Sequence, residues 1–260
     1  MPYKTITLSH EDRVSLLTLN RPDKRNAISF ELVDEVLQAL DEVKKSDASV
    51  LVLTGAGKAF SGGLDLESLK ALIGRSHEQN VHDTRTMAQL FRTVYEFPKP
   101  TVAAVNGAAI AGGTGLATLC DITVASTEAK FGYTEVRIGF IPAIVSSFLV
   151  RQVGEKQARE LLLTGRIFDA AEAYRIGLIN EVVEPARLMT RVREIVGMLL
   201  ENSPLSLLAT KKLINGFGAE ELNGQIESAV IENARSRTTR DFGEGVTAFL
   251  EKRKPQWLGK

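Results

Sequence analysis

The chain has 260 residues, of which 44% are hydrophobic and 25% charged, and its 32 Lys and Arg balance 32 Asp and Glu. This composition is typical of a globular protein with a sizeable core, and it disfavours a general binder of nucleic acid or membrane surfaces, which would carry a basic excess. The single cysteine, Cys120, indicates a reducing compartment. Residues 1–14 lack the apolar core of a signal peptide and no apolar run could span a bilayer, so we expect a cytoplasmic protein without membrane contacts.

The N-terminal part predicts a hairpin, a helix and a buried strand. Two alternating apolar runs within 6–20 flank the polar letters HEDR and are typical of a hairpin. After a polar loop at 21–29, Ser29 is a suitable N-cap for a helix over 30–45, whose apolar residues recur at helical spacing. The run SVLVLTG at 49–55 predicts a buried strand.

The remaining pattern alternates strands and helices and then becomes mainly helical. A glycine-rich stretch follows the first buried strand, and residues 75–97 have helical period. Further strands are expected at 100–107, 122–126 and within 129–136. From about residue 143 the chain is mainly helical, and we therefore expect an α/β core over 1–200 and a helical region over 201–260.

The glycine-rich loops fail the tests for nucleotide binding. Residues 107–114 nearly match G-x-x-x-x-G-K-[ST], but Gly113 stands where the lysine that reaches the phosphates is required. In the loop GAGK, Val52 takes the place of the first glycine, and neither loop carries the dinucleotide fingerprint G-x-G-x-x-G. These patterns argue against a nucleoside triphosphatase and a dinucleotide enzyme.

The sequence motifs of a serine hydrolase and of a helical zinc site are also missing. Ser61 lies in AFSGG and lacks the G-x-S-x-G elbow of a serine hydrolase. His77 and His82 are five residues apart, which places them off the i, i+4 face that a helical zinc pair uses. We expect the three histidines to lie on the surface or at an interface, and we predict no metal site.

The two loops together favour an oxyanion site. SVLVLTG and PTVAAVNG each lead into small residues and then a helix, where backbone N–H groups can point outward. One N–H from each loop can hold a single oxyanion, and small residues let a ligand approach the backbone. Tight packing of helix on strand would explain either loop alone, whereas the pair favours anion binding.

Several long motifs occur together along the chain: NRPDKRNAIS at 20–29, AFSGGLDL at 59–66, PTVAAVNGAAIAGGTGLATLCDI at 100–122, FGYTEVRIGFIP at 131–142 and LLLTGRIFDAAEAYRIGLINEVV at 161–183. With them the chain resembles the crotonase superfamily, the enoyl-CoA hydratase/isomerase family, nearly from end to end. The resemblance implies an α/β spiral of repeated ββα units with a helical C-terminal trimerisation region. It also implies homotrimers, often paired into hexamers.

The resemblance implies an acyl-CoA thioester substrate and an enolate intermediate. The backbone N–H groups of Leu64 and Gly112 would hold the enolate oxygen, and Glu135 in F-G-Y-T-E would be the acid/base. No cofactor is implied beyond the CoA of the substrate itself. Two-glutamate hydratases carry a second carboxylate in the G-G-x loop, where this chain has Gly115.

Candidate CoA contacts follow from the same motifs. Lys24 and Arg25 are expected to pair with the phosphates of CoA, and Ala27 and the segment Leu64–Leu66, with Asp65 and Leu66, to line the adenine and pantetheine path. In the C-terminal FLEKRKPQW, Lys252 and Lys254 are further candidates, in many members from a neighbouring subunit. For each set the alternative is a solvated polar segment.

Four side chains have roles that are predicted from the residues around them. Apolar neighbours of Glu135, namely Phe131, Ile138, Phe140 and Ile141, are expected to raise its pKa by desolvation. Arg137 is a candidate partner of Glu135 or of a substrate carboxylate. Asp65 and Asp121 follow the two loops and suit capping or hydrogen bonding of their own turns.

Three functions remain open. The first is hydration of a 2-enoyl-CoA with Glu135 as acid/base, and the loop G-G-x-G-L with E-V-R-I-G resembles a branch of bacterial methylglutaconyl-CoA-type hydratases. The second is a Δ3,Δ2-enoyl-CoA isomerase, which needs a single glutamate to shuttle a proton. The third is a non-catalytic acyl-CoA-binding or RNA-binding oligomer. The intact oxyanion pair and Glu135 weigh against the third, and the balanced charge weighs against RNA.

Overall fold

The computed structural model describes residues 2–259, and it begins with the expected hairpin and helix. Strands β1 (Ile6–Glu11) and β2 (Val14–Leu19) pair antiparallel around Asp12 and Arg13, whose φ angles of 45° and 65° are those of a tight hairpin turn. Helix α1 (Phe30–Lys45) is capped by Ser29, whose side chain accepts a hydrogen bond from the Leu32 N–H. The predicted elements of this part are confirmed.

The larger of two sheets has six strands in the order β1-β2-β3-β5-β7-β10. Beyond the hairpin it is parallel, through β3 (Val50–Gly55), β5 (Thr101–Val105), β7 (Ile122–Ser126) and β10 (Glu181–Val183). Both faces of its central strands are covered, which explains their continuous apolar runs. Leu51 and Leu53 pack in the main core with α1, whereas Val50 and Val52 pack with α7.

The smaller sheet has four short strands in the order β4-β6-β8-β9. These are β4 (Ala59–Ser61), β6 (Ala108–Ile110), β8 (Lys130–Gly132) and β9 (Ile167–Asp169). In each of the successive pairs β3/β4, β5/β6 and β7/β8, the first strand joins the large sheet and the second joins the small one. With the helix that follows each pair, this is the expected spiral of ββα units.

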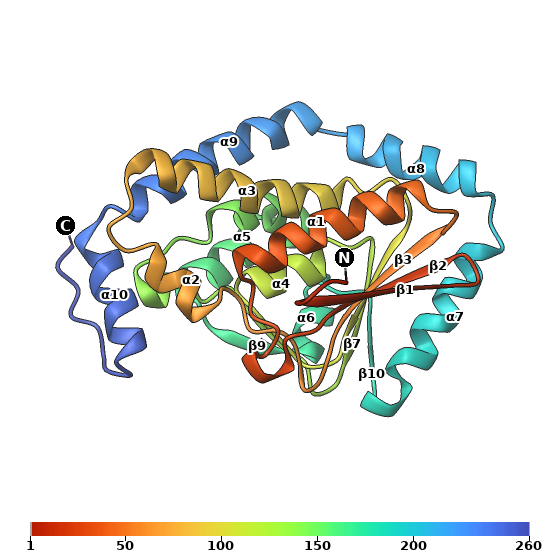
Figure 1. Ribbon diagram of the computed structural model, residues 1–260, viewed down its shortest axis with the longest axis horizontal. Coiled ribbons are helices and arrows are strands. Elements are labelled where there is room, and N and C mark those ends of the chain that lie inside the picture. Colours follow the sequence, from red (N-terminus) through yellow and green to blue (C-terminus); the bar gives the residue numbers. More distant parts are fainter. Residues whose placement is uncertain (1, 260) are drawn as a thin grey trace.

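Helices cover the sheets and extend to the C-terminus (Figure 1). In Figure 1, α9 runs beside α3, and α10 lies at the end of the molecule near α2. Helix α5 breaks at Gly154, where φ is 76° and ψ is 161°. The helical bounds are α2 (Leu66–Ala71), α3 (His77–Tyr95), α4 (Gly112–Thr118), α5 (Ala143–Thr164), α6 (Ala170–Arg175), α7 (Leu188–Leu200), α8 (Pro204–Gly216), α9 (Ala219–Ser236) and α10 (Arg240–Leu250), with short 3₁₀ turns η1 (Pro22–Lys24), η2 (Glu135–Ile138) and η3 (Pro185–Arg187).

Four short strands were not predicted from the sequence. β4 and β6 lie inside what reads as glycine-rich loops, and β9 and β10 lie in the stretch that reads as mainly helical. Each has three residues, which is too short for an alternating pattern to develop. The helices of the C-terminal part are present as expected. The division at residue 200 stays a prediction, because Leu222, Ile226 and Val230 of α9 belong to the main core.

Among residues 2–259, none of the helices is both long enough and apolar enough to cross a membrane.

Candidate active site

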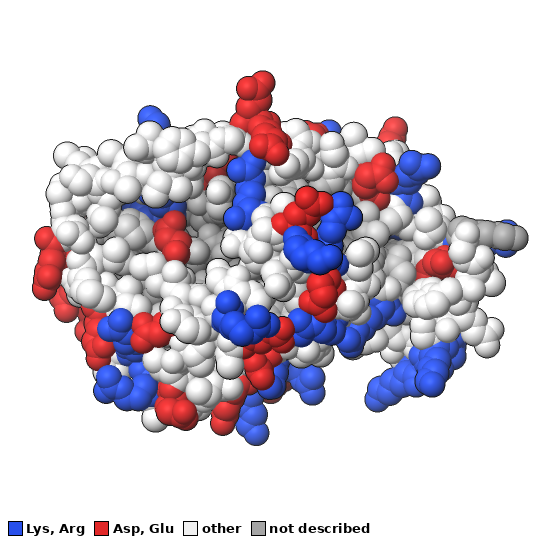
Figure 2. Space-filling view, turned by 180° about the vertical axis from the view of Figure 1, so that it is seen from behind, with Lys and Arg blue, Asp and Glu red and all other residues white. Residues whose placement is uncertain are grey.

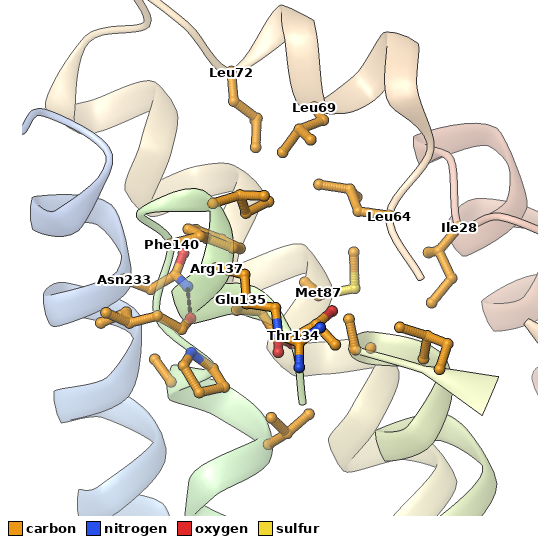
Figure 3. A pocket seen from close by; sticks show the side chains of 18 of the residues that line it. Ile28, Leu64, Leu69, Leu72, Met87, Thr134, Glu135, Arg137, Phe140 and Asn233 are labelled. Carbon is orange, nitrogen blue, oxygen red and sulfur yellow. Dashed lines mark hydrogen bonds between the residues drawn. The ribbon is translucent and has the colours of Figure 1, made fainter. Parts of the chain in front are cut away.

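A cavity of about 440 Å³ lies among α2, α3, η2, α9 and α10 (Figure 3). Its wall is mainly apolar, and in Figure 3 Leu64, Leu69 and Leu72 point into it from one side while Glu135 lies among the central lining residues. The predicted oxyanion residues Leu64 and Gly112 line the same cavity as Glu135. The structure therefore brings the three predicted catalytic residues together. The ionisable residues in the wall are Asp83, Glu135, Arg137, Arg237 and Arg253.

The two glycine-rich loops lie in contact, as an oxyanion site built from both requires. β4 pairs with β6, and a Cβ at Gly107 would collide with the carbonyl oxygen of Lys58. A Cβ at Gly113 would lie 2.5 Å from the carbonyl oxygen of Ser61. These positions need glycine because backbone passes against backbone.

The Leu64 N–H is left free by the way its segment pairs. An isolated parallel bridge joins Leu64 to Ile28, through hydrogen bonds from the Ile28 N–H to the Gly63 carbonyl (2.7 Å) and from the Asp65 N–H to the Ile28 carbonyl (2.9 Å). Both bonds use groups of the residues beside Leu64. Within residues 2–259 the Leu64 N–H has no hydrogen-bond acceptor.

The Gly112 N–H has no acceptor in the described part of the chain, because Gly112 begins helix α4. The preceding residue, Ala111, has φ 52° and ψ −124°, a conformation that L-residues adopt at a cost of about 1–3 kcal/mol. A hydrogen bond of 2.6 Å from the Ala111 N–H to the Gly132 carbonyl holds it there. Since the Ala111 dihedrals set the direction of the next peptide, this strained residue orients the Gly112 N–H.

Glu135 is a buried carboxyl with an unused oxygen. It begins η2, which is separated from β8 by Tyr133 and Thr134, and 8% of the residue is exposed. Its Oε2 atom is buried and has no hydrogen-bond partner within residues 2–259. Desolvation raises the pKa of Glu135 to about 7, which confirms the expected direction and cause. The group can therefore give and take a proton near neutral pH.

The position of the second hydratase carboxylate is closed. Gly115 lies in α4, and a Cβ there would be 2.6 Å from Cγ1 of Val145 and 3.6 Å from a ring carbon of Phe91. Asp83 is the other carboxylate in the wall, and it already forms an ion pair with Arg75. The cavity thus offers one carboxylate, Glu135, for proton transfer.

Arg137 does not pair with Glu135. It is exposed and lines the cavity, and no ion pair joins the two side chains in the described part of the chain. Its expected alternative role, binding a substrate carboxylate, stays a prediction.

The predicted CoA-binding segment lies against the oxyanion loop. Lys24 and Arg25 are exposed, and Lys24 forms a 3.2 Å ion pair with Glu67. The Arg25 carbonyl accepts a hydrogen bond of 2.8 Å from the Gly62 N–H. Ala27 is half-buried next to the bridge between Ile28 and Leu64. Arg25 has no ion-pair partner among residues 2–259, whereas Lys24 would exchange Glu67 for a phosphate. Their role in CoA binding stays a prediction.

Asp65 and Leu66 have different surroundings. Asp65 caps α2 through the N–H groups of Glu67 and Ser68 and forms a 2.8 Å ion pair with Arg21. Burial alone would raise the pKa of Asp65, but the hydrogen bonds from Arg21 and from the helix start outweigh it and lower the pKa. Its carboxylate is therefore occupied by the protein. Leu66 is 53% exposed beside the loop.

The C-terminal segment reaches the cavity through residues other than the predicted ones. Arg253 and Pro255 line the wall, whereas Lys252 and Lys254 are exposed and do not. Arg253 is held by Glu244 at 2.6 Å. The structure does not bring Lys252 together with the other predicted site residues within one chain, and its role in substrate binding stays a prediction.

Asp121 is structural, as its position after the second loop indicated. Its Oδ2 accepts hydrogen bonds from the Thr101 N–H at 2.7 Å and from the Lys211 ammonium at 2.6 Å. The histidines are exposed as expected. In the described range 2–259, no group of His, Cys, Asp or Glu side chains could hold a metal ion.

One residue that positions the site, Asn26, was not predicted from the sequence. Asn26 is fully buried and donates two hydrogen bonds of 2.8 Å, to the carbonyls of Ala56 and Ala59. Its own carbonyl accepts from Ser61 at 2.9 Å. These bonds fasten the loop that carries Lys24 and Arg25 onto β4. The polar letters of this loop gave no signal that one of them would be buried.

The family model described as "Enoyl-CoA hydratase/isomerase" matches residues 9–260. A Thermus thermophilus relative, named as an enoyl-CoA hydratase, is 45% identical over 94% of this chain and 97% of its own. The crotonyl-CoA hydratase of Syntrophomonas wolfei is 35% identical over 100% of both chains. A crystal structure of an enoyl-CoA hydratase from Mycobacterium avium superposes with a TM-score of 0.87 at 34% identity, covering 97% of this chain and 98% of that one.

Proposed function

Because this chain belongs to the enoyl-CoA hydratase/isomerase family, we propose that it is a hydratase that adds water to a 2-enoyl-CoA thioester with Glu135 as the sole acid/base. The observation that carries the proposal is one buried carboxyl, with an unpartnered oxygen and a pKa near 7, in the same cavity as two free backbone N–H groups.

The thioester carbonyl oxygen would bind between the N–H groups of Leu64 and Gly112. Negative charge develops on this oxygen when a nucleophile adds to C3 of the enoyl group, because the electrons of the double bond move toward the carbonyl. Two donors that are already fixed stabilise that charge without reorganising. The pairing of β4 with β6 joins the two loops that carry these donors.

Glu135 would perform both proton transfers in turn. In its ionised form it takes a proton from a water molecule, whose oxygen forms the new bond to C3. The enolate then collapses as Glu135 returns the same proton to C2. The product is a 3-hydroxyacyl-CoA, and the carboxylate is restored. A pKa near 7 suits this cycle, since neither protonation state is strongly favoured at neutral pH.

The isomerase alternative is favoured by one observation, the closed position at Gly115. A single carboxylate that removes a proton from C2 of a 3-enoyl-CoA and returns it to C4 would give the 2-enoyl-CoA. This route uses the same oxyanion donors and needs no bound water.

We further propose that the protein works as a homotrimer or hexamer in the cytoplasm. The chemistry needs no cofactor beyond the CoA of its substrate, since the proposed residues supply both the proton and the charge stabilisation. Lys24, Arg25 and Ala27 would contact CoA, with Lys252 contributing from the same or a neighbouring subunit.

The test measures turnover of crotonyl-CoA and of 3-hexenoyl-CoA by the wild type and by Glu135→Gln. We expect loss of the 2-enoyl absorbance with the wild type, and a loss of activity of about 10²- to 10⁴-fold in the variant. Conversion of the 3-enoyl ester alone would replace hydration by isomerisation. Binding of both esters without turnover, or full activity in Glu135→Gln, would contradict the proposal and favour the non-catalytic alternative.

A further inference from the structure

At one side of the cavity, a single carboxylate, that of Asp83, faces two guanidinium groups. Asp83 of α3 forms an ion pair with Arg75, and its side chain is 11% exposed. A second guanidinium, that of Arg237 just after α9, has its Nη1 atom 3.9 Å from Oδ2 of Asp83, beyond hydrogen-bond distance. Two cations therefore share one carboxylate, and Arg75 holds the closer position.

Arg237 is buried without hydrogen-bond partners for two of its nitrogens. Its side chain is 6% exposed, and neither Nε nor Nη1 has an acceptor among the described residues. Its guanidinium lies over the ring of Phe140, with the central carbon 5.3 Å from the ring centroid. Burial lowers the pKa of Arg237 to about 10, so the group is still charged at neutral pH. A buried cation with unused donors is unfavourable unless an anion completes it.

The cation belongs to the same cavity as the proposed acid/base. Arg237, Phe140 and Glu135 all line it, and the Phe140 N–H donates to the Glu135 carbonyl at 3.1 Å. Phe140 thus connects Glu135 with Arg237: its backbone is hydrogen-bonded to η2, and its ring lies under the guanidinium. A substrate whose C2 and C3 lie at Glu135 would extend toward Arg237.

The other polar side chains near Arg237 are either paired or exposed to solvent, so Arg237 is the buried cation whose donors lack acceptors among residues 2–259. Asn233, one turn earlier on α9, donates to the Ile141 carbonyl at 3.3 Å (Figure 3) and accepts from Thr84 at 2.9 Å. Arg253 is held by Glu244. Arg137 is exposed and remains in contact with solvent.

We propose that Arg237 binds a carboxylate at the far end of the acyl chain, so that the preferred substrate is the CoA thioester of a short dicarboxylic acid. This inference rests on the proposed function and names its substrate class. A planar guanidinium can meet a carboxylate through two parallel N–H bonds, which also orients the chain. A methyl group at the same place would leave the donors unpaired.

Binding of unreactive saturated esters tests the inference without turnover. Calorimetric titration of the wild type with glutaryl-CoA and valeryl-CoA compares a carboxylate with a methyl group on chains of equal carbon number. We expect glutaryl-CoA to bind about 10- to 100-fold more tightly, the range of a charge-assisted hydrogen bond pair. Equal affinities in the wild type would overturn the inference, whatever the variants do.

Variants assign the preference to the residue. Arg237→Met removes the charge at similar length and should abolish the preference, whereas Arg237→Lys should keep part of it. Arg85→Met is the matched control. Arg85 lies on the same helix as Asp83, but its side chain is 60% exposed. A preference that survives in Arg237→Met would overturn the assignment.

Kinetics separate this inference from the proposed function. With glutaconyl-CoA and 2-pentenoyl-CoA, Arg237→Met should lower kcat/KM for the first ester by about 10- to 100-fold and leave the second nearly unchanged. An equal loss for both esters would indicate a purely structural arginine and would overturn the inference while hydration stands. No turnover of either ester by the wild type, with glutaryl-CoA still preferred in binding, would contradict the proposed function and leave the carboxylate site intact.

Discussion

Glu135 is held in surroundings that oppose its ionised form. The carboxyl is 8% exposed, and its Oε2 atom receives no hydrogen bond from residues 2–259. The same desolvation that brings its pKa near 7 makes the ionised form costly for the folded protein. Under this account the catalytic group reduces stability at neutral pH.

This cost predicts that Glu135→Gln stabilises the protein at high pH. The pKa of Glu135 is raised from 4.5 to about 7 on folding, so the carboxyl adds no cost below 4.5, and its cost grows as the pH rises toward 7. The full free-energy penalty above pH 7 is about 3.5 kcal/mol, from about 1.4 kcal/mol per unit of pKa. Urea unfolding at about pH 8 should show the variant to be more stable, and the difference should vanish at about pH 4. A difference that is the same at both values would contradict the assigned pKa.

Single residues of the site differ in how far the sequence predicts them. Glu135, Leu64 and Gly112 follow from their motifs, and all three line one cavity. Asn26 and Arg237 give no such signal, because their importance depends on burial and on partners far away in the sequence. Asn26 reads as one of several polar loop residues, and Arg237 as one of many charges near the C-terminus.

At the scale of elements, the start of α4 and strand β4 must touch for the two oxyanion donors to converge. Gly113 is the contact point, since a Cβ there would be 2.5 Å from the Ser61 carbonyl oxygen and 2.8 Å from its Cβ. Ser61 is itself fixed by its hydrogen bond to the Asn26 carbonyl. Neither side of this contact can move without disturbing the loop beyond it.

Gly113→Ala should therefore separate the donors. We expect a loss of kcat of about 10²- to 10³-fold, comparable to losing one oxyanion donor, and a loss of stability of about 1–3 kcal/mol from overpacking. Gly197→Ala is the control, because a Cβ on that helical glycine of α7 meets no atom within 4 Å. Steady-state kinetics and thermal unfolding of both variants give the comparison. Normal kcat in Gly113→Ala would contradict the importance of the contact.

The sequence predicts long elements better than short ones. The apolar period of α1 and the continuous runs of β3 and β5 are strong local signals, and each element lies where the pattern placed it. β4 and β6 are formed by pairing with each other, and no three-residue segment carries that information alone. The family resemblance implied repeated ββα units, but it gave no residue range for β4 or β6 and no second sheet.

At the scale of the whole molecule, α8 carries an apolar face that the single chain leaves open. Leu205 is 79% exposed, Phe217 66% and Leu213 63%, and Lys211 is the only buried residue of the helix. Figure 2, which views the molecule from behind, has few charged side chains where α8 lies, whereas both charges mix over much of the rest. An exposed apolar surface of this kind is typical of an interface.

We expect this face to be covered in a homotrimer or hexamer. Light scattering should give three or six times the 28.4 kDa mass of one chain. The double variant Leu213→Glu, Phe217→Glu should shift the mass toward the monomer, because charges are costly to bury at an interface. Lys70→Glu on α2, at the opposite end of Figure 1, is the control for a change of charge. A monomeric wild type would contradict the expected assembly.

The central claim, that a single carboxyl with a pKa near 7 runs both proton transfers, is tested most directly by the pH dependence of kcat/KM for hydration. Glu135 must begin the cycle ionised, so kcat/KM should fall about tenfold per pH unit below about pH 7 and level off above it. The predicted result is one ionisation near 7 that governs the rate. A profile that stays level down to about pH 5 would contradict the account, because it would require a base with the pKa of an ordinary exposed carboxyl.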